Sequence, residues 1–133
     1  APSHAVFSEV GWWINPSGLL KLMEYVQHAY KPQAQYITEN GYGSMNKHLF
    51  IQGDLDDGIR ALYLQEHITV MQQAMAKGIP CKGYFAWSLL DNIEWEHGIS
   101  KRFGIVHVDF QTKKRTLKKS ALWYKNFIER AKL

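Results

Sequence analysis

Hydrophobic side chains recur at helical spacing in three stretches of the sequence, with polar positions between them. The first stretch begins at Asn15, a residue that can cap free helix amides, and ends just before Pro32. The second covers residues 58–77, with Gly78 just beyond its end. The third covers residues 116–131. The pattern therefore predicts three helices in this chain.

Between these repeats lie short apolar stretches of the kind that form strands. Residues 33–38 and 82–89 are the two clear candidates, and residues 105–110 form a shorter extended piece that alternates apolar and polar side chains. Strands that alternate with helices of this length predict βα units and a parallel sheet. We expect residues 36–38 and 84–88 to be neighbouring parallel strands, with the second helix as their crossover.

The number of strands limits what this chain can form alone. Two parallel strands can neither bury both faces of a sheet nor close a barrel, and a complete (β/α)8 barrel needs about 250 residues. The chain has 133 residues and no segment with the composition of a linker. We therefore expect an α/β fold without an internal domain boundary over residues 1–133, and we expect it to be part of a larger fold.

Composition and charge argue against a disordered or nucleic-acid-binding protein. An apolar fraction of 46% with mixed charges is typical of a globular protein. The net charge is only +4, and much of it lies in a basic cluster near the C-terminus that has no aromatic stacking surface beside it. We interpret this cluster as the solvated entry to the third helix rather than as a nucleic-acid site. Its members are Lys113, Lys114, Arg115, Lys118 and Lys119.

Other chemistries find little support in the residue pattern. Cys81 is the single cysteine, so the chain cannot form an internal disulfide, and we expect a reducing, cytoplasmic location. The six histidines show no paired ligand spacing, and Ser88 lacks the Gly-x-Ser-x-Gly context of a nucleophile elbow. No apolar run reaches the length of a membrane span. We expect no metal, no cofactor and no membrane partner.

Two short runs carry the candidate chemistry. The first is Thr-Glu-Asn-Gly over residues 38–41, which places the carboxylate of Glu39 at a strand end just before a glycine turn. The second extends from Trp87 through Glu94 to a further tryptophan. Carboxylates at strand ends beside tryptophan and asparagine suit a sugar-cleaving site, because one carboxylate can attack the sugar while indole faces stack on its ring. From spacing alone, a solvent-facing or capping role for Glu39 and a core position for Trp87 remain open.

Both runs resemble the signatures of glycoside hydrolase family 1, the family of β-glucosidases and related retaining β-glycosidases. The Thr-Glu-Asn-Gly run is similar, residue for residue, to the nucleophile motif of the family, which implies that Glu39 attacks the anomeric carbon. By the same resemblance, Trp87 forms an aromatic wall of the site, Glu94 accepts hydrogen bonds from glycone hydroxyls, and Trp95 donates its indole N–H. Phe103 then closes one side of the pocket.

Details of these segments refine what the resemblance implies. Ile93 stands where the family more often has phenylalanine. Relatives that act on 6-phosphorylated sugars have a small polar residue in place of Glu94, so this carboxylate implies a glycone without phosphate. The charge of Arg102 suits a phosphate, but we expect this side chain to pair with a carboxylate of the scaffold. The loop after Gly41 departs from the pattern of the family, which leaves the preferred leaving group open.

The resemblance runs from about Gly11 to Ile128 and covers only the C-terminal part of a family member. It implies that the chain provides the C-terminal βα units of an incomplete (β/α)8 TIM barrel. The Asn-Glu-Pro segment that supplies the acid/base in the family is absent from this sequence. We therefore expect a β-glucosidase-like chain, inactive alone, whose partners are a β-glucoside and the complementary N-terminal part of the barrel. The alternative is a catalytically incomplete fragment that only binds sugar or completes a barrel.

Overall fold

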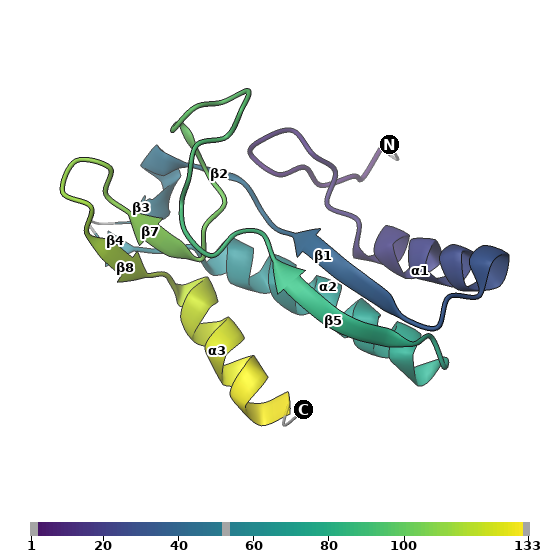
Figure 1. The fold of residues 1–133 in the computed structure, drawn as a ribbon. Coiled ribbons are helices and arrows are strands. Elements are labelled where there is room, and N and C mark those ends of the chain that lie inside the picture. The colour runs from purple at the N-terminus through teal and green to yellow at the C-terminus, as the bar shows by residue number, and fades with distance from the viewer. Residues whose placement is uncertain (1–2, 52–53, 132–133) are drawn as a thin grey trace.

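The computed structural model describes residues 3–51 and 54–131, and its larger elements alternate helix and strand (Figure 1). These elements are α1 (Pro16–Tyr30), β1 (Gln35–Asn40), α2 (Gly58–Ala76), β5 (Cys81–Ala86) and α3 (Lys119–Ala131). β1 and β5 pair in parallel, and α2 forms the crossover that lies behind them in Figure 1. The predicted parallel pair is therefore confirmed.

Short elements occupy the connections on either side of α2. Between β1 and α2 lie β2 (Ser44–Met45), the 3-10 helix η1 (Asn46–Leu49), β3 (Phe50–Ile51) and β4 (Asp54–Leu55). Between β5 and α3 lie β6 (Lys101–Arg102), β7 (Val106–Val108) and β8 (Arg115–Leu117). Antiparallel pairs join β2 to β6, β3 to β4 and β7 to β8. The β2–β6 pair ties together the loops that follow β1 and β5.

Local signals fix both ends of α1. The side chain of Asn15 caps the helix, with its Oδ1 accepting a hydrogen bond from the backbone N–H of Gly18 at 3.1 Å. Pro16 occupies the first turn, where its missing N–H costs nothing. At the other end, Lys31 adopts a left-handed conformation with φ of 47° directly before Pro32. The predicted start and end of this helix are confirmed.

The predicted start of the third helix is wrong. Thr116 belongs to β8, where it pairs with His107 of β7, and α3 begins only at Lys119. Between them, the backbone N–H of Lys118 donates to the carbonyl of Ile105 at 3.1 Å. This bond to a distant residue holds the chain extended, and helical spacing in the sequence gives no sign of it.

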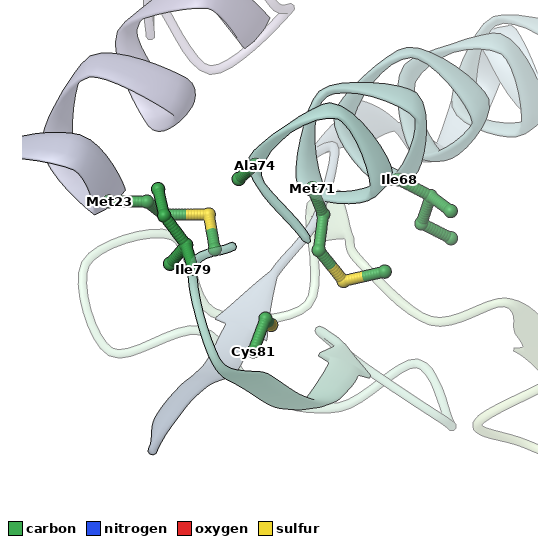
Figure 2. Packing of buried hydrophobic residues seen from close by; sticks show 6 residues of the cluster. All are labelled: Met23, Ile68, Met71, Ala74, Ile79 and Cys81. Carbon is green, nitrogen blue, oxygen red and sulfur yellow. The ribbon is translucent and has the colours of Figure 1, made fainter. Parts of the chain in front are cut away.

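The core lies between the helices and one face of the two long strands (Figure 2). Met23 of α1, Met71 of α2 and Cys81 of β5 meet there. The remaining buried members of this cluster are Ile68, Ala74 and Ile79. A second cluster around Leu64 and Ala121 extends the core toward α3. Burial of this apolar surface holds the strand pair against the helices.

The opposite face of the strand pair is open. Tyr36 of β1 is 58% exposed and Phe85 of β5 is 57% exposed. Within the described residues, no further strand pairs with β1 or β5. The sheet is therefore covered on one face only.

No helix in the described part of the chain has the length and apolar character needed to span a bilayer.

Candidate active site

A cleft of about 750 Å³ lies where β1 and β5 end. Its lining comes from the end of β1, the loop that follows β5, the start of the β6–β7 connection and the N-terminal segment. The cleft brings together all five residues that the sequence singled out, namely Glu39, Trp87, Glu94, Trp95 and Phe103. It also contains residues that received no role from the sequence, namely Trp12, Asn92, Ile93, Glu96 and His97.

Glu39 and Trp87 approach the cleft from adjacent strand ends. The side chain of Glu39 is exposed, and Trp87 is 37% exposed. The backbone N–H of Trp87 donates to the carbonyl of Asn40 at 2.9 Å, so the two strand ends are hydrogen-bonded at the cleft. A Cβ atom on Gly41 would lie 1.7 Å from the carbonyl oxygen of Trp87. Only glycine permits this close approach of the two backbones.

Phe103 forms a buried side of the cleft. Its side chain is 2% exposed, and its ring centroid lies 5.5 Å from that of Trp12 at an interplanar angle of 46°. A Cβ atom on Gly43 would approach Cζ of Phe103 to 2.6 Å, so the ring also rests on a glycine backbone. Trp12 itself is 60% exposed. It lies in an apolar stretch near the N-terminus whose sequence carried no signal of a site.

The loop that carries Glu94 and Trp95 is closed by a short turn. The backbone N–H of Glu94 donates to the carbonyl of Gly98 at 2.9 Å, and the N–H of Gly98 donates back at 2.7 Å. Gly98 adopts a φ of +58°, which favours glycine. Oε1 of Glu94 is buried and has no hydrogen-bond partner within the described residues. Trp95, by contrast, is fully exposed.

A buried carboxylate oxygen without a hydrogen-bond donor carries a desolvation penalty, because it loses its hydrogen bonds to water and no other donor replaces them. Glu94 therefore offers a vacant acceptor at the cleft. A ligand hydroxyl would satisfy it.

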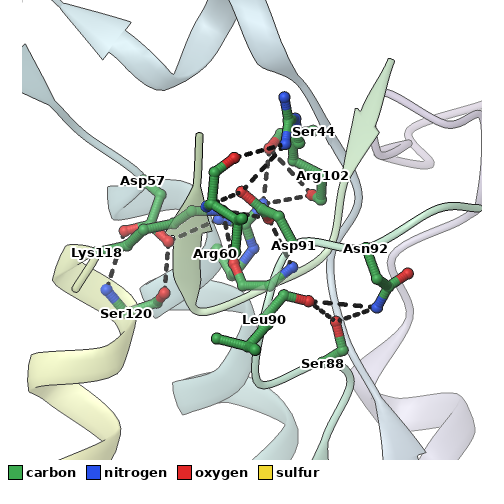
Figure 3. Close-up of polar contacts among 12 residues, drawn as sticks. Ser44, Asp57, Arg60, Ser88, Leu90, Asp91, Asn92, Arg102, Lys118 and Ser120 are labelled. Atoms are coloured by element: carbon green, nitrogen blue, oxygen red, sulfur yellow. Dashed lines mark hydrogen bonds and ion pairs between the residues drawn. The ribbon is translucent and has the colours of Figure 1, made fainter. Parts of the chain in front are cut away.

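Asp91 is the centre of a first buried polar node, which connects the loop after β5 to neighbouring segments (Figure 3). Its Oδ1 accepts from the backbone N–H of Gly104 at 3.0 Å and from Nζ of Lys118 at 2.8 Å. Its Oδ2 accepts from the backbone N–H of Val108 at 3.3 Å and lies 3.8 Å from Nη1 of Arg102. The expected pairing of Arg102 with a scaffold carboxylate is therefore confirmed. One carboxylate joins the loop after β5 to β6, β7 and the start of α3.

Lys118 corrects the interpretation of the basic cluster. Its side chain is 0% exposed, so it is not part of a solvated helix entry. The ammonium group donates to Asp91 and, at 2.6 Å, to the carbonyl of Gly104. Burial lowers the pKa of Lys118 to about 8, and the charge of Arg60 acts in the same direction, while Asp91 opposes the change. Lys118 is a structural cation.

Arg60 is the centre of a second buried polar node, which is also drawn in Figure 3. It is 1% exposed and pairs with Asp57 at 2.7 Å between Nη1 and Oδ2. Its Nη2 donates to Oγ of Ser44 and to the carbonyl of Arg102, both at 2.7 Å. Asp57 also accepts from the backbone N–H of Ser120 at 2.9 Å. This node connects the β2–β6 pair to the starts of α2 and α3.

Within residues 3–51 and 54–131, no three His, Cys, Asp or Glu side chains gather closely enough to hold a metal ion. The cleft thus combines an exposed carboxylate, a buried carboxylate oxygen without a partner and four aromatic side chains. Aromatic faces stack on sugar rings, and carboxylates bind their hydroxyls or attack the anomeric carbon.

Comparison with known proteins decides the family. The model of glycosyl hydrolase family 1 matches residues 3–133. The chain belongs to glycosyl hydrolase family 1. It is 47% identical over 120 residues to a 1,4-beta-D-glucan glucohydrolase of Thermotoga neapolitana and 45% identical over 120 residues to beta-glucosidase A of Thermotoga maritima. Beta-glucosidase 47 of Arabidopsis thaliana is 44% identical over 113 residues.

The two Thermotoga alignments each cover 90% of this family 1 chain but only 27% of the relative. For the Arabidopsis relative, the shares are 85% and 20%. A solved family 1 β-glucosidase of Thermotoga maritima in complex with isofagomine lactam shows the same proportion. Its TM-score to this chain is 0.90 at 41% identity, with 100% of this chain and 30% of the other chain covered. The family 1 β-glucosidases are TIM barrels, and this chain corresponds to less than a third of one.

Proposed function

We propose that this chain is the nucleophile-bearing, C-terminal part of a retaining β-glycosidase that hydrolyses β-glucosides. The observation that carries the proposal is the cleft that Glu39 shares with Trp87 and Glu94 at the ends of two parallel strands. In TIM barrels, catalytic residues lie at the C-terminal ends of strands. The similarity to proteins named β-glucosidases supports the same activity.

In this proposal, Glu39 attacks the anomeric carbon and forms a covalent glycosyl–enzyme intermediate. A second carboxylic acid, about 5–5.5 Å away, donates its proton to the departing oxygen. The same group then takes a proton from water, which hydrolyses the intermediate and restores the Glu39 carboxylate. Because the sequence has no Asn-Glu-Pro segment, we assign the second group to the complementary part of the barrel.

The remaining cleft residues recognise the glycone. The buried, unpaired Oε1 of Glu94 accepts a hydrogen bond from a sugar hydroxyl, which replaces its lost water. Trp87 provides apolar surface for the sugar ring, Phe103 closes one side of the cleft, and Trp95 donates its indole N–H to a further hydroxyl. A carboxylate at this position repels a phosphate, so the substrate class is a glycone without phosphate.

The complementary N-terminal part of the barrel is the proposed macromolecular partner. The open face of the strand pair, with Tyr36 and Phe85 exposed, is the surface that it would cover. The share of the relatives that this chain spans, 27%, fits such a division. A fragment that only binds sugar is the competing function, and the missing Asn-Glu-Pro segment favours it for the chain alone.

The test uses a completed barrel, which we define as this chain fused to the remaining part of the Thermotoga maritima β-glucosidase. An activated 2-fluoro glucoside traps the covalent intermediate, and peptide mapping by mass spectrometry locates it. We expect the label on Glu39, and we expect Glu39→Gln to lose the label and nearly all hydrolysis of an aryl β-glucoside. Glu96→Gln, which changes another cleft carboxylate, is the matched control. A label on Glu94, or full activity of Glu39→Gln, would overturn the assignment.

A further inference from the structure

The direction of Glu39 depends on one extra residue in β1. Ile37 lies opposite Tyr84 and Asn40 lies opposite Ala86, so three steps along β1 correspond to two steps along β5. Ile37 packs against the helix-side core. In a regular strand Glu39, two residues further on, would point to that same side. The extra residue is a bulge, a feature that redirects side chains.

The bulge changes the directions in which the side chains of Glu39 and Asn40 point. Glu39 is exposed and lines the cleft, whereas the side chain of Asn40 reaches toward the tyrosines on the helix side. The hydroxyl of Tyr84 donates to Oδ1 of Asn40 at 2.6 Å. Nδ2 of Asn40 in turn donates to the hydroxyl of Tyr63 at 3.2 Å. The amide is thus held between two phenols from different elements, β5 and α2.

Both phenols are well placed to act as fixed partners. Burial raises the pKa of Tyr84 and of Tyr63, so both hydroxyls keep their protons and Tyr84 remains a donor. The ring of Tyr63 stacks on His67 with centroids 3.9 Å apart, and it is tilted against Tyr42 at 5.9 Å. The partners of Asn40 are therefore themselves packed in place.

The backbone of Asn40 also makes a contact at the cleft. Its carbonyl accepts the N–H of Trp87 at 2.9 Å, the contact that sets the two strand ends side by side at the cleft. Asn40 is therefore bonded to Glu39 along the chain and to Trp87 across the sheet.

We propose that Asn40 is a positioning residue for the reaction. Its amide, held between Tyr63 and Tyr84, maintains the bulge that turns Glu39 into the cleft, and its carbonyl fixes the place of Trp87 relative to Glu39. The inference rests on the proposed function, in which Glu39 is the nucleophile. A nucleophile displaced by about 1 Å loses on the order of 100-fold in rate, so loosening the amide reduces the rate of attack.

The test compares variants of the completed barrel. Asn40→Ala removes both side-chain hydrogen bonds, and Tyr84→Phe and Tyr63→Phe each remove a single oxygen. Tyr124→Phe is the matched control, because its hydroxyl bonds the backbone carbonyl of Tyr84 at 3.1 Å and does not bond Asn40. The rate constant for labelling by the activated 2-fluoro glucoside is measured, and the final extent of labelling by intact mass counts the active sites.

We expect Asn40→Ala, Tyr84→Phe and Tyr63→Phe to slow labelling per active site by about 10- to 100-fold. The inhibition constant of a competitive sugar analogue changes less than threefold, because these variants keep Glu94, Trp95 and the backbone carbonyl of residue 40 that holds Trp87. Tyr124→Phe labels at the wild-type rate. If Asn40→Ala does not fold, the two single-oxygen variants provide the same comparison.

Two results would overturn the inference. Labelling of Glu39 at the wild-type rate per site in these variants, even with fewer active sites, would mean that Asn40 acts only in folding, and the proposed function would stand. A label on another residue in the unmodified protein would remove the proposed function itself, and the positioning role with it.

Discussion

The ammonium of Lys118 lies 2.8 Å from the carboxylate of Asp91, and neither side chain is exposed to solvent. The two residues are 27 positions apart, and together they connect the start of α3 to the loop that carries the candidate glycone-binding residues. Removal of either partner of such a buried pair destabilises the fold, because the remaining charge is left buried without a counter-ion.

We predict that Lys118→Met destabilises the completed barrel by about 3–5 kcal/mol, because Asp91 becomes a buried charge without its main counter-ion. Adding Asp91→Asn to this variant recovers part of the loss, since the stranded charge is removed. Urea unfolding measures both effects. Lys119→Met is the control, because the neighbouring pair of Lys119 with Asp56 is partly exposed and contributes about 0–1 kcal/mol. Equal losses for Lys118→Met and Lys119→Met would contradict the prediction.

Glu94→Gln tests glycone recognition separately from catalysis. We expect the variant still to form the covalent label on Glu39. We expect it to discriminate between glucosides and galactosides about 10- to 100-fold less well, because this factor corresponds to the free energy of one hydrogen bond to a charged acceptor. The measurement is the ratio of kcat/KM for the two aryl glycosides. Unchanged selectivity in Glu94→Gln would remove Glu94 from the recognition site.

His67 gives the protein a predicted sensitivity to acid. Burial lowers its pKa, and its Nδ1 lies 2.8 Å from the carbonyl of Tyr63, a geometry that the neutral ring satisfies as a donor. The folded state therefore binds a proton less readily than the unfolded state. The unfolded state takes up more protons as the pH falls below about 6.5, so the free energy of unfolding decreases there.

We expect this decrease between pH 7 and pH 5 to be smaller in His67→Gln, measured by urea unfolding of the completed barrel at each pH. The pKa of His107 is also lowered by burial. We therefore expect the double variant His67→Gln/His107→Gln to show a still smaller dependence of the free energy of unfolding on pH. Identical pH profiles of the parent protein and His67→Gln would show that His67 is not responsible.

The open sheet face leads to a prediction for the isolated chain. In the described part of the chain, β1 and β5 pair with no further strand, and Tyr36 and Phe85 are exposed. The strand pair therefore presents apolar surface and free backbone groups to solvent. We expect the 133 residues alone to be aggregated, molten or bound to a complementary fragment. Light scattering after gel filtration and binding of a hydrophobic dye test this. A monomer with a sharp cooperative unfolding transition would contradict it.

The sequence allowed correct prediction of features that local signals determine. The ends of α1 follow from Asn15 and Pro32, and the parallel pairing of β1 and β5 follows from their alternation with helices. The grouping of the five predicted residues in one cleft required the resemblance to a family as well as the strand pattern.

The remaining features depend on contacts between distant segments. Lys118 belongs to a basic cluster in the sequence, and only its contacts with Asp91 and Gly104 explain its burial. The bulge at Asn40 depends on the register of β5, which the residues of β1 do not specify alone. Trp12 enters the cleft because it packs on Phe103, far along the chain. Helical or strand periodicity contains none of these relationships.

The two buried nodes also determine when the cleft can become rigid during synthesis. The bond from the backbone N–H of Ser120 to Asp57 cannot form until Ser120, 63 residues later, has been synthesised. The bond from Lys118 to Asp91 likewise requires that Lys118 has been added. The N-terminal part of a chain leaves the ribosome first, so Glu39 and the loop that carries Glu94 emerge before Lys118 and Ser120. We therefore expect the cleft to become rigid only after Lys118 and Ser120 have emerged, and we expect a nascent chain stalled before Lys118 to lack the bonds that these residues make to Asp91 and Asp57.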